Sequence, residues 1–550
     1  MSEAAIPVES IAAAERLLGV AYTEAERAMM AESIAAQIDL ARQRRSVRLP
    51  ETLAPATRFD PRLPGFAMPD AGAFRPDAGA APDLPDSDDD IAYAPVASLG
   101  RWISRRRISA VRLAGIYLDR IARIGPTLEC IATLTPELAL QQAERADRLL
   151  AQGTYLGPLH GIPWGCKDII DTAGIVTGWG AEPWRGRVPQ TDATVVRLLT
   201  AAGAVMLGKL TVGALAYGDI WYGGRTRNPW NIEEGSSGSS AGSGAATAAG
   251  LVGFSLGTET LGSIVAPSLR CGATGLRPTF GRVSRGGAMP LCWTLDKIGP
   301  ICRSVEDTAL VLQALTAADP ADPCQIAAPF GYDAAAPVAG LRVGYYEADF
   351  ADAGAIDLDR AMVETVRGLG VELVALQRPE LPYGSLMSTL IAEAAASFEE
   401  LTLSDRDDEL TWQEPGAWPN TFRKARFLSA IDHIQLDRLR RRVMQDMDAA
   451  FREVDAMIGP PLAGPMLIIT NYTGHPCLVL PSGFRQSETR SPLSLARARL
   501  DQGEQTAGPK HTVPHSVCLW GRLFEEGTIL RLGRAIEAAC GVRHRRPPVG

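Results

Sequence analysis

A block of glycine and serine between Gly235 and Ser263, reading GSSGSSAGSGAATAAGLVGFSLGTETLGS, constrains the fold of this chain most strongly. Such a composition alone is typical of a flexible linker. Here the block contains a small-residue apolar run at 245–256 and passes without a break into the apolar residues from Ile264 to Pro267. A solvated linker is not joined to core-like sequence on both sides. We therefore expect the glycines to be structural.

The overall composition is that of an ordinary globular protein. Its 550 residues are 46% hydrophobic and 21% charged, enough to bury the core of one large domain or two ordinary ones. Acidic residues outnumber basic ones by 63 to 55, so the net charge is -8 and no basic face is expected to follow a phosphate backbone. Nucleic acid is therefore not expected as a partner.

The cysteines and the N-terminal charges bear on cofactors and on location. Nine cysteines are spread singly, without a Cys-x-x-Cys pair, so neither a disulfide framework nor a zinc site is expected. We predict no metal and no cofactor. Glu3, Glu9 and Glu15 with the late Arg16 have the wrong charge order for a secretory signal, and the run at 245–256 is too short to span a bilayer. These features predict a cytoplasmic protein without a membrane partner.

Two regions precede the main part of the chain. Residues 1–48 have apolar positions three and four apart, and Thr23 and Glu26 have the spacing of a capping box, which predicts a small helical segment. Residues 49–97 are rich in proline and aspartate, a composition that predicts an extended, solvated linker.

The main domain is expected to cover residues 98–550. Short apolar runs at 161–166 and 204–207 are typical of buried strands, and they alternate with helical stretches such as 193–199. This alternation predicts an α/β fold in which helices cover both faces of a sheet.

A phosphate-binding loop is one alternative for the glycine-rich block, because glycines let backbone N–H groups approach an anion closely. No Gly-Lys-Ser/Thr sequence closes the block. The most similar segment, Gly203 to Leu210, has a leucine where a magnesium-binding hydroxyl is needed. We interpret that segment as a chance similarity.

A nucleophile elbow is the second alternative. GSSAG, from Gly238 to Gly242, fits the G-x-S-x-G pattern and would make Ser240 the nucleophile of an α/β-hydrolase-type esterase. An elbow needs a strand directly before the serine, whereas residues 231–238 are polar and turn-like. It also needs a late histidine, and His511 or His515 could serve. The chain order leaves this alternative open.

Lys167 is a candidate general base for a nucleophilic serine. It follows the apolar run GIPWGC, which should carry its side chain toward the interior. A serine needs a base within hydrogen-bond reach, either a histidine or a lysine kept neutral. Lowering the pKa of a lysine from about 10.4 to about 7 costs roughly 4.6 kcal/mol, which burial can supply. Taken alone, Lys167 is equally well read as the ion-pair partner of the adjacent Asp168.

These segments together resemble the amidase signature family. GIPWGCKD carries Lys167, GSSAGS carries Ser239, and GTETLGSI carries Ser263. The two serines are 24 residues apart, which is the family's spacing. Similar segments are NPW at 228–230 and later stretches at 271–284, 299–307 and 471–476, so the resemblance covers about residues 98–545. It implies a single large α/β domain with a central mixed sheet, preceded by a helical segment.

The resemblance also implies a mechanism. Ser263 would be the nucleophile, Ser239 would relay its proton, and Lys167 would be the neutral base behind Ser239, with a cis peptide bond before Ser239. The oxyanion hole would consist of backbone N–H groups of Thr260, Leu261, Gly262 and Ser263. The implied reaction is hydrolysis of a carboxamide C–N bond through an acyl-enzyme. A catalytically inactive binding protein that retains these residues is a further alternative.

Departures from the family pattern narrow the expected substrate. Ala241 and Leu261 replace glycines, and Val265 stands where many members have arginine. Losing that arginine makes the site more apolar, which weighs against a small anionic or zwitterionic substrate and against the A-type component of a tRNA amidotransferase. We therefore expect a stand-alone amidase or aryl-acylamide hydrolase that acts on a small apolar or aryl amide, with side activity on esters or carbamates.

Two further expectations concern the surroundings of the site. The pocket walls are expected to come from residues 214–227 and 383–426. The helical segment at 1–48 resembles an N-terminal extension of some stand-alone family members that assists dimerisation, so a homodimer is a compatible assembly.

Overall fold

A single eleven-stranded sheet forms the centre of the protein. The computed structural model describes residues 6–70, 72–80, 82–352, 354–490 and 509–549. Parallel pairs such as β3 with β9 and antiparallel pairs such as β9 with β11 occur in the same sheet, so it is mixed, as predicted. Across the sheet the strands are β14 (Glu372–Ala375), β13 (Arg342–Tyr345), β15 (Ala456–Gly459), β17 (His511–Gly521), β16 (Cys477–Ser487), β10 (Thr274–Arg277), β11 (Lys297–Cys302), β9 (Phe254–Glu259), β3 (Pro163–Lys167), β4 (Val205–Leu210) and β2 (Ile131–Leu134).

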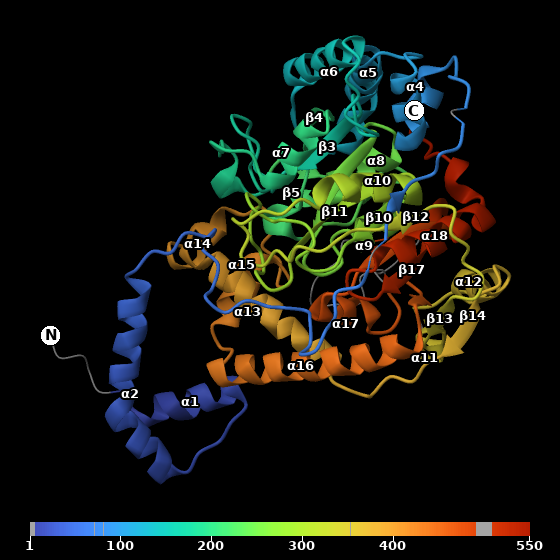
Figure 1. The fold of residues 1–550 in the computed structure, drawn as a ribbon. Helices are drawn as coiled ribbons and strands as arrows, with labels where there is room; N and C mark the ends of the chain where they lie inside the picture. The colour runs from blue at the N-terminus through green and yellow to red at the C-terminus, as the bar shows by residue number, and fades with distance from the viewer. Residues whose placement is uncertain (1–5, 71, 81, 353, 491–508, 550) are drawn as a thin grey trace.

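Helices flank this sheet, which confirms the predicted α/β fold (Figure 1). Among the described residues, none of the helices is long and apolar enough to cross a membrane. The helices of the main domain are α5 (Ala110–Leu128), α6 (Pro136–Ala151), α7 (Thr194–Ala201), α8 (Ala241–Ala248), α9 (Val265–Cys271), α10 (Val305–Leu315), α11 (Glu347–Ala351), α12 (Asp357–Arg367), α13 (Met387–Ser397), α14 (Glu399–Leu403), α15 (Trp418–Ala425), α16 (Ala430–Glu453), α17 (Met466–Thr473) and α18 (Glu526–Cys540).

The glycine-serine block lies in the core and not in a linker. Its first half becomes helix α8, which consists only of alanine, glycine, serine and threonine and is buried along its whole length. A Cβ atom at Gly242 would lie 2.4 Å from the backbone nitrogen of Thr211 and 2.4 Å from the carbonyl oxygen of Cys130. The small residues are therefore needed because the helix packs directly against neighbouring backbone. The second half becomes strand β9.

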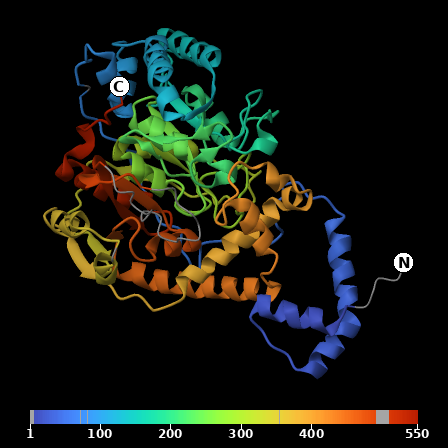
Figure 2. The ribbon, with the colours of Figure 1, turned by 180° about the vertical axis from the view of Figure 1, so that it is seen from behind.

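The N-terminal helices form a hairpin that projects away from the body of the protein (Figures 1 and 2). Helix α1 (Val8–Leu18) packs on α2 (Glu24–Arg45), and Arg27 of α2 pairs with Glu15 of α1 at 2.7 Å. The capping box at Thr23 is present, as predicted. No residue of α2 is buried, and Arg44 at its end forms an ion pair with Glu399 of α14. Residues 1–5 of the predicted helical segment lie outside the described residues.

The segment after the hairpin is more structured than the expected linker. Strand β1 (Phe74–Arg75) pairs in parallel with β12 (Tyr332–Asp333), and the chain continues into α3 (Asp88–Tyr93) and α4 (Val96–Ser104). The expectation of an extended connector up to residue 97 is thus wrong for its last part. The acidic run that suggested solvation forms the first turn of α3, where carboxylates are favoured. There Asp89 contacts Arg120 and Arg123 of α5.

Short two-stranded ribbons complete the architecture. Strands β5 (Ile220–Trp221) and β6 (Gly224–Arg225) form one, and β7 (Arg227–Asn228) and β8 (Asn231–Gly235) form the other. Both ribbons lie just before α8 in the sequence, so they bring the chain to the serine loop between β8 and α8.

Candidate active site

The ends of two parallel strands and one loop bring the predicted catalytic residues together. Strand β3 ends at Lys167, and its neighbour β9 carries Thr258 near its own end. The pairing of Cys166 with Leu256 places these two ends at the same edge of the sheet. The loop between β8 and α8 supplies Ser239 at this edge.

Lys167 is surrounded by hydroxyl groups. Its side chain is fully buried, and its Nζ atom lies 2.8 Å from Ser239 Oγ, 3.0 Å from Ser240 Oγ and 2.7 Å from Thr258 Oγ1. It forms no ion pair within the described parts of the chain. Burial lowers the pKa of Lys167 well below its ordinary value, and the carboxylates of Asp296 and Glu259 oppose this only in part. A neutral amine has a lone pair that can accept a proton from a neighbouring hydroxyl.

Asp168, the alternative partner of this lysine, is directed elsewhere. Its Oδ2 atom accepts a hydrogen bond from the backbone N–H of Gly178 at 3.0 Å. Burial raises the pKa of Asp168 to about 7, and the nearby Lys209 opposes this shift. The structure therefore does not support reading Lys167 as the ion-pair partner of Asp168.

Ser239 is held in a closely packed loop. The peptide bond between Gly238 and Ser239 is cis, as the resemblance implied. A Cβ atom at Gly238 would lie 1.9 Å from the carbonyl oxygen of Gly218, so only glycine fits there. The Asp219 carboxylate accepts the backbone N–H of Ser237 at 3.0 Å and a hydrogen bond from Arg225 at 3.1 Å. These contacts tie the serine loop to the β5–β6 ribbon.

Ser240 has the surroundings of a structural residue. It is fully buried, and its Oγ atom donates to the carbonyl of Thr258 and accepts the backbone N–H of the same residue, both at 3.1 Å. Neither late histidine is hydrogen-bonded to it, because His515 contacts Asp359 at 2.8 Å and His511 lies 3.9 Å from Glu233. The nucleophile-elbow alternative is thus not supported.

One argument against that elbow is nevertheless wrong. A short strand, β8, does precede the serine loop, although residues 231–238 were expected to be turn-like. It pairs only with β7, in a two-residue register, and does not join the central sheet. A polar sequence forms a strand here because the hairpin partner is adjacent in the chain and supplies the backbone hydrogen bonds.

Ser263 lies in the loop between β9 and α9. The buried carboxylate of Glu259 accepts the backbone N–H groups of Ile264 at 2.8 Å and Val265 at 3.0 Å, and it pairs with Arg277 at 2.7 Å. Burial by itself would raise the pKa of Glu259, but Arg277 and these donors lower it to about 2. The carboxylate therefore stays ionised and fixes the residues directly after Ser263.

The predicted oxyanion hole belongs to the same loop. Gly262 has a positive φ of 82°, which glycine adopts without strain. The backbone N–H groups of Thr260, Leu261, Gly262 and Ser263 donate to no acceptor in the described residues, so they are available to a bound oxyanion. The roles of Lys167, Ser239, Ser263 and these four N–H groups remain predictions.

Ser263 opens into a pocket with a largely apolar and aromatic wall. Tyr217 contacts Trp412 and Trp418 with ring centroids 4.9 and 5.1 Å apart. The wall comes from both segments that were expected from the sequence, 214–227 and 383–426. The lining residues are Ala216, Tyr217, Gly218, Asp219, Ile220, Arg225, Ser237, Gly238, Thr260, Leu261, Ser263, Arg270, Leu291, Leu390, Trp412 and Trp418.

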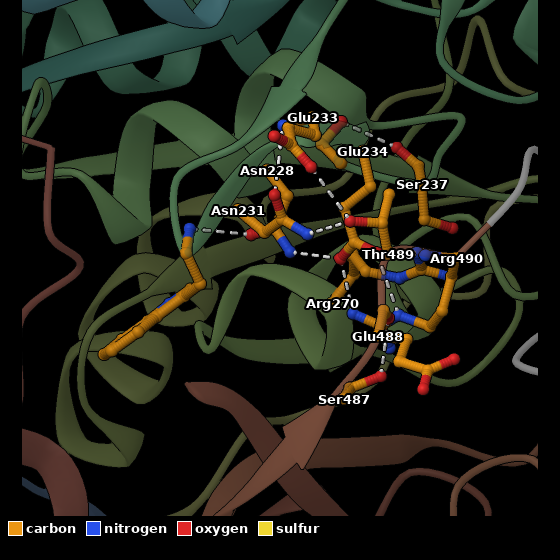
Figure 3. Close-up of polar contacts among 12 residues, drawn as sticks. Asn228, Asn231, Glu233, Glu234, Ser237, Arg270, Ser487, Glu488, Thr489 and Arg490 are labelled. Carbon is orange, nitrogen blue, oxygen red and sulfur yellow. Dashed lines mark hydrogen bonds and ion pairs between the residues drawn. The ribbon is translucent and has the colours of Figure 1, made fainter. Parts of the chain in front are cut away.

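A charged network lies behind this pocket (Figure 3). Glu234 of β8 contacts Arg490 at 2.6 Å, Arg270 of α9 at 3.5 Å and the amide of Asn228 at 2.7 Å. Burial opposes ionisation of Glu234, but the two arginines lower its pKa to about 2. The network holds the segment around Thr489 against β8. It was not predicted from the sequence, since its partners are remote in the chain and belong to no motif.

No metal centre was expected, and the structure offers no candidate for one in the parts it describes. Within those ranges, no group of three or more histidine, cysteine, aspartate or glutamate side chains could hold a metal ion.

Comparisons with known proteins agree with this geometry. Residues 112–479 match the amidase family. The chain is 35% identical to the A component of the glutamyl-tRNA(Gln) amidotransferase of Geobacter metallireducens over 477 residues, which cover 80% of this chain and 95% of that protein. The corresponding component from Roseiflexus castenholzii is 34% identical, with 82% of this chain and 97% of that protein covered.

Solved structures show the same similarity. The native peptide amidase of Stenotrophomonas maltophilia is 28% identical with a TM-score of 0.68, and the match covers 83% of this chain and 98% of that chain. A 6-aminohexanoate cyclic dimer hydrolase in complex with its substrate has a TM-score of 0.69 at 20% identity, over 83% of this chain and 99% of that chain, so it shares the fold.

Proposed function

Because the chain belongs to the amidase signature family, an enzyme family that hydrolyses amide C–N bonds, we propose that it cleaves a carboxamide with an apolar or aryl acyl group. One observation carries this proposal. The fully buried amine of Lys167 lies 2.8 Å from Ser239 Oγ, in the loop that borders the pocket of Ser263. A lysine kept neutral by burial is the base that a serine relay requires.

The proposed reaction has two stages. Ser263 Oγ attacks the amide carbonyl while its proton passes to Ser239, whose own proton passes to Lys167. The N–H groups of residues 260–263 stabilise the oxyanion. Reversal of the relay protonates the leaving nitrogen, which an amide needs because an amine anion is a poor leaving group. Water then cleaves the acyl-enzyme through the same relay.

The pocket supports an apolar or aryl acyl group. Tyr217, Trp412 and Trp418 provide aromatic surfaces, and Leu261 and Leu390 add aliphatic ones. Aromatic pockets with few polar groups favour flat apolar ligands. Esters and carbamates of the same acyl group are expected as side substrates, since they pass through the same acyl-enzyme.

A direct experiment tests the catalytic assignment. Ser263→Ala should abolish hydrolysis of an activated arylacyl anilide and labelling by a fluorophosphonate. The matched variant Ser240→Ala should keep labelling, because Ser240 supports Lys167 and forms no acyl-enzyme. Wild-type turnover by Ser263→Ala would exclude the triad, and loss of labelling only in Ser240→Ala would restore the nucleophile-elbow alternative.

A second candidate function is that of the A component of a glutamyl-tRNA(Gln) amidotransferase. The 35% identity to such a protein favours it. The aromatic wall of the pocket favours the apolar amide instead. Hydrolysis of glutamine compared with hydrolysis of an arylacyl primary amide distinguishes the two. A higher kcat/KM for glutamine would favour the second candidate.

Assembly and location are also proposals. We propose a homodimer through the α1–α2 hairpin, since no residue of α2 is buried against the rest of the chain. Sedimentation of the full chain and of a variant lacking residues 1–48 tests it. A cytoplasmic location is supported by nine cysteines that are all free, eight of them buried. Fractionation of cells tests the location.

A further inference from the structure

A second chamber adjoins the pocket of Ser263. The two cavities share Ala216, Thr260 and Leu291 as common wall. From these residues the chamber extends along Met289 and Trp293. Thr52 and Ala54, from the segment after the N-terminal hairpin, form part of its outer wall. The proposed acyl pocket does not need this space.

The chamber lies on the side of the catalytic base. Thr258 lines the chamber but not the pocket of Ser263. Its hydroxyl is 2.7 Å from Lys167 Nζ, the group that supplies the proton to the leaving nitrogen in the proposed reaction. The nitrogen of a bound amide must point toward that proton source. The substituent on the nitrogen is therefore directed toward the chamber wall formed by Thr258 and Thr260.

The walls of the chamber combine apolar surface with one acidic group. Met289, Trp293 and Ile298 are apolar or aromatic. The carboxylate of Asp296 accepts hydrogen bonds from the Thr260 hydroxyl at 2.6 Å and from the backbone N–H groups of Leu291 and Cys292 at 2.8 and 2.9 Å.

These three contacts favour the ionised form of Asp296. Burial raises the pKa of Asp296, but all three neighbouring groups are donors, and a protonated acid would place its own proton against them. Lys297 lies beside it, and burial lowers the pKa of this lysine to about 7, so its charge compensates Asp296 only partly near neutral pH. The Lys297 amine donates to the carbonyl of Leu295.

We propose that this chamber binds the amine half of the amide and that Asp296 receives the amine as an ammonium ion after cleavage. The inference rests on the proposed function and names the second half of its substrate: an alkyl or aryl amine attached to an apolar acyl group.

The proposed step balances as follows. The bond from Ser263 Oγ to the carbonyl carbon forms, and the C–N bond breaks. The serine proton arrives at the nitrogen through Ser239 and Lys167, so a neutral amine is released. The amine then takes one more proton from solvent, and the resulting ammonium ion is attracted by the Asp296 carboxylate. No oxidant, reductant or further reactant takes part.

A pair of half-buried tryptophans provides the main test. Trp293 lines the chamber, and Trp412 lines the acyl pocket. A primary amide, an anilide and a nitrophenyl ester of one arylacetic acid would be compared in the full-length enzyme. All three give the same acyl-enzyme, so the rate constant of deacylation reports only on the acyl pocket.

We expect Trp293→Ala to lower kcat/KM for the anilide by at least about tenfold, while the primary amide and the deacylation rate change less than about twofold. Trp412→Ala should lower all three. Ala288→Trp, which fills the chamber from its rim, should repeat the selective loss for the anilide. Equal losses for anilide and primary amide in both chamber variants would overturn the inference. So would a change of deacylation in Trp293→Ala.

Asp296→Asn tests the ammonium site separately. Benzylamine is protonated at neutral pH and benzyl alcohol is neutral, although the two are similar in shape. The inhibition constant of benzylamine should rise at least about tenfold in the variant, and that of benzyl alcohol should not. An equal rise for both would show a purely structural role and contradict the inference. If the wild-type enzyme cleaves none of the amides, the proposed function fails first, and the inference falls with it.

Discussion

The catalytic edge of the sheet and the N-terminal hairpin differ in how their residues are held. At the sheet edge, Lys167 and Glu259 are fully buried, and every polar contact of their side chains is made within the protein. In helix α2, Met29 is 62% exposed and Leu40 is 66% exposed, and the hairpin contacts the body through the exposed ion pair between Arg44 and Glu399.

The difference shows which region depends on a complete set of contacts. Burying ionisable groups costs several kcal/mol unless each has partners, so the catalytic edge persists only with its surrounding network intact. The hairpin has few such requirements, because exposed ion pairs contribute about 0–1 kcal/mol. We therefore expect changes at the sheet edge to have large effects and changes in the hairpin to have small ones.

The largest effect is expected for Lys167→Met. Methionine has a similar length and no base, so kcat/KM for an arylacyl anilide should fall by about 10⁴-fold. Steady-state kinetics measures the loss, and circular dichroism checks the fold. The melting temperature should not decrease, since the variant removes a costly buried amine. A variant that retains a tenth of the wild-type activity would remove Lys167 from the mechanism.

Glu259→Gln comes second and is expected to affect stability. It leaves the guanidinium of Arg277, which is fully buried, without its counter-charge. Removing one partner of such a pair costs about 3–5 kcal/mol, to be measured by denaturant unfolding. The double variant Glu259→Gln with Arg277→Met should recover part of the loss. A single variant as stable as the wild type would mean that the network is not needed.

The pH dependence of stability is a smaller effect with a defined sign. Burial lowers the pKa of Lys167, so between this value and the ordinary lysine value near about 10.4 the unfolded chain binds a proton that the folded protein does not. Stability should therefore rise with pH through this window. It should be lost again as pH falls, until the pH drops below the lowered pKa. Denaturant unfolding at several pH values would detect the rise, and Lys167→Met should reduce it.

The smallest effect is expected for deletion of residues 1–48. The hairpin has little buried surface against the body, so the melting temperature should change by no more than about 2 °C and kcat/KM for the anilide by less than about twofold. Thermal unfolding and kinetics would measure both. A loss of several degrees would show that the hairpin supports the catalytic domain and would remove the contrast between the two regions.

The sequence predicted most of the site but little of what surrounds it. Lys167 could be placed at the end of a buried strand because the apolar run before it is a local signal. Ser239 was chosen over Ser240 by family register alone, and the structure supplies the physical difference, since the Ser240 hydroxyl is engaged by Thr258. The strand before this loop was missed, because a polar hairpin has no apolar pattern.

Contacts between distant segments were beyond local reasoning. Glu234 and Arg490 are far apart in the chain, and no pattern in either segment indicates that they meet. The acidic run at 88–90 has the composition of a linker, yet it forms a helix turn because arginines of α5 lie beside it. Such pairings depend on which strands and helices become neighbours.

By itself, the sequence determined the chemistry: a serine pair, a lysine at the end of an apolar strand, and a small-residue helix between them. These features depend on residue type and spacing, which are local. Only the tertiary structure decided which hydroxyls reach Lys167 and which aromatic side chains form the acyl wall. It also placed a second chamber beside Thr260. The physical reason is that packing of the sheet edge brings together segments from β3, β8, β9 and α13, and no segment encodes its neighbours alone.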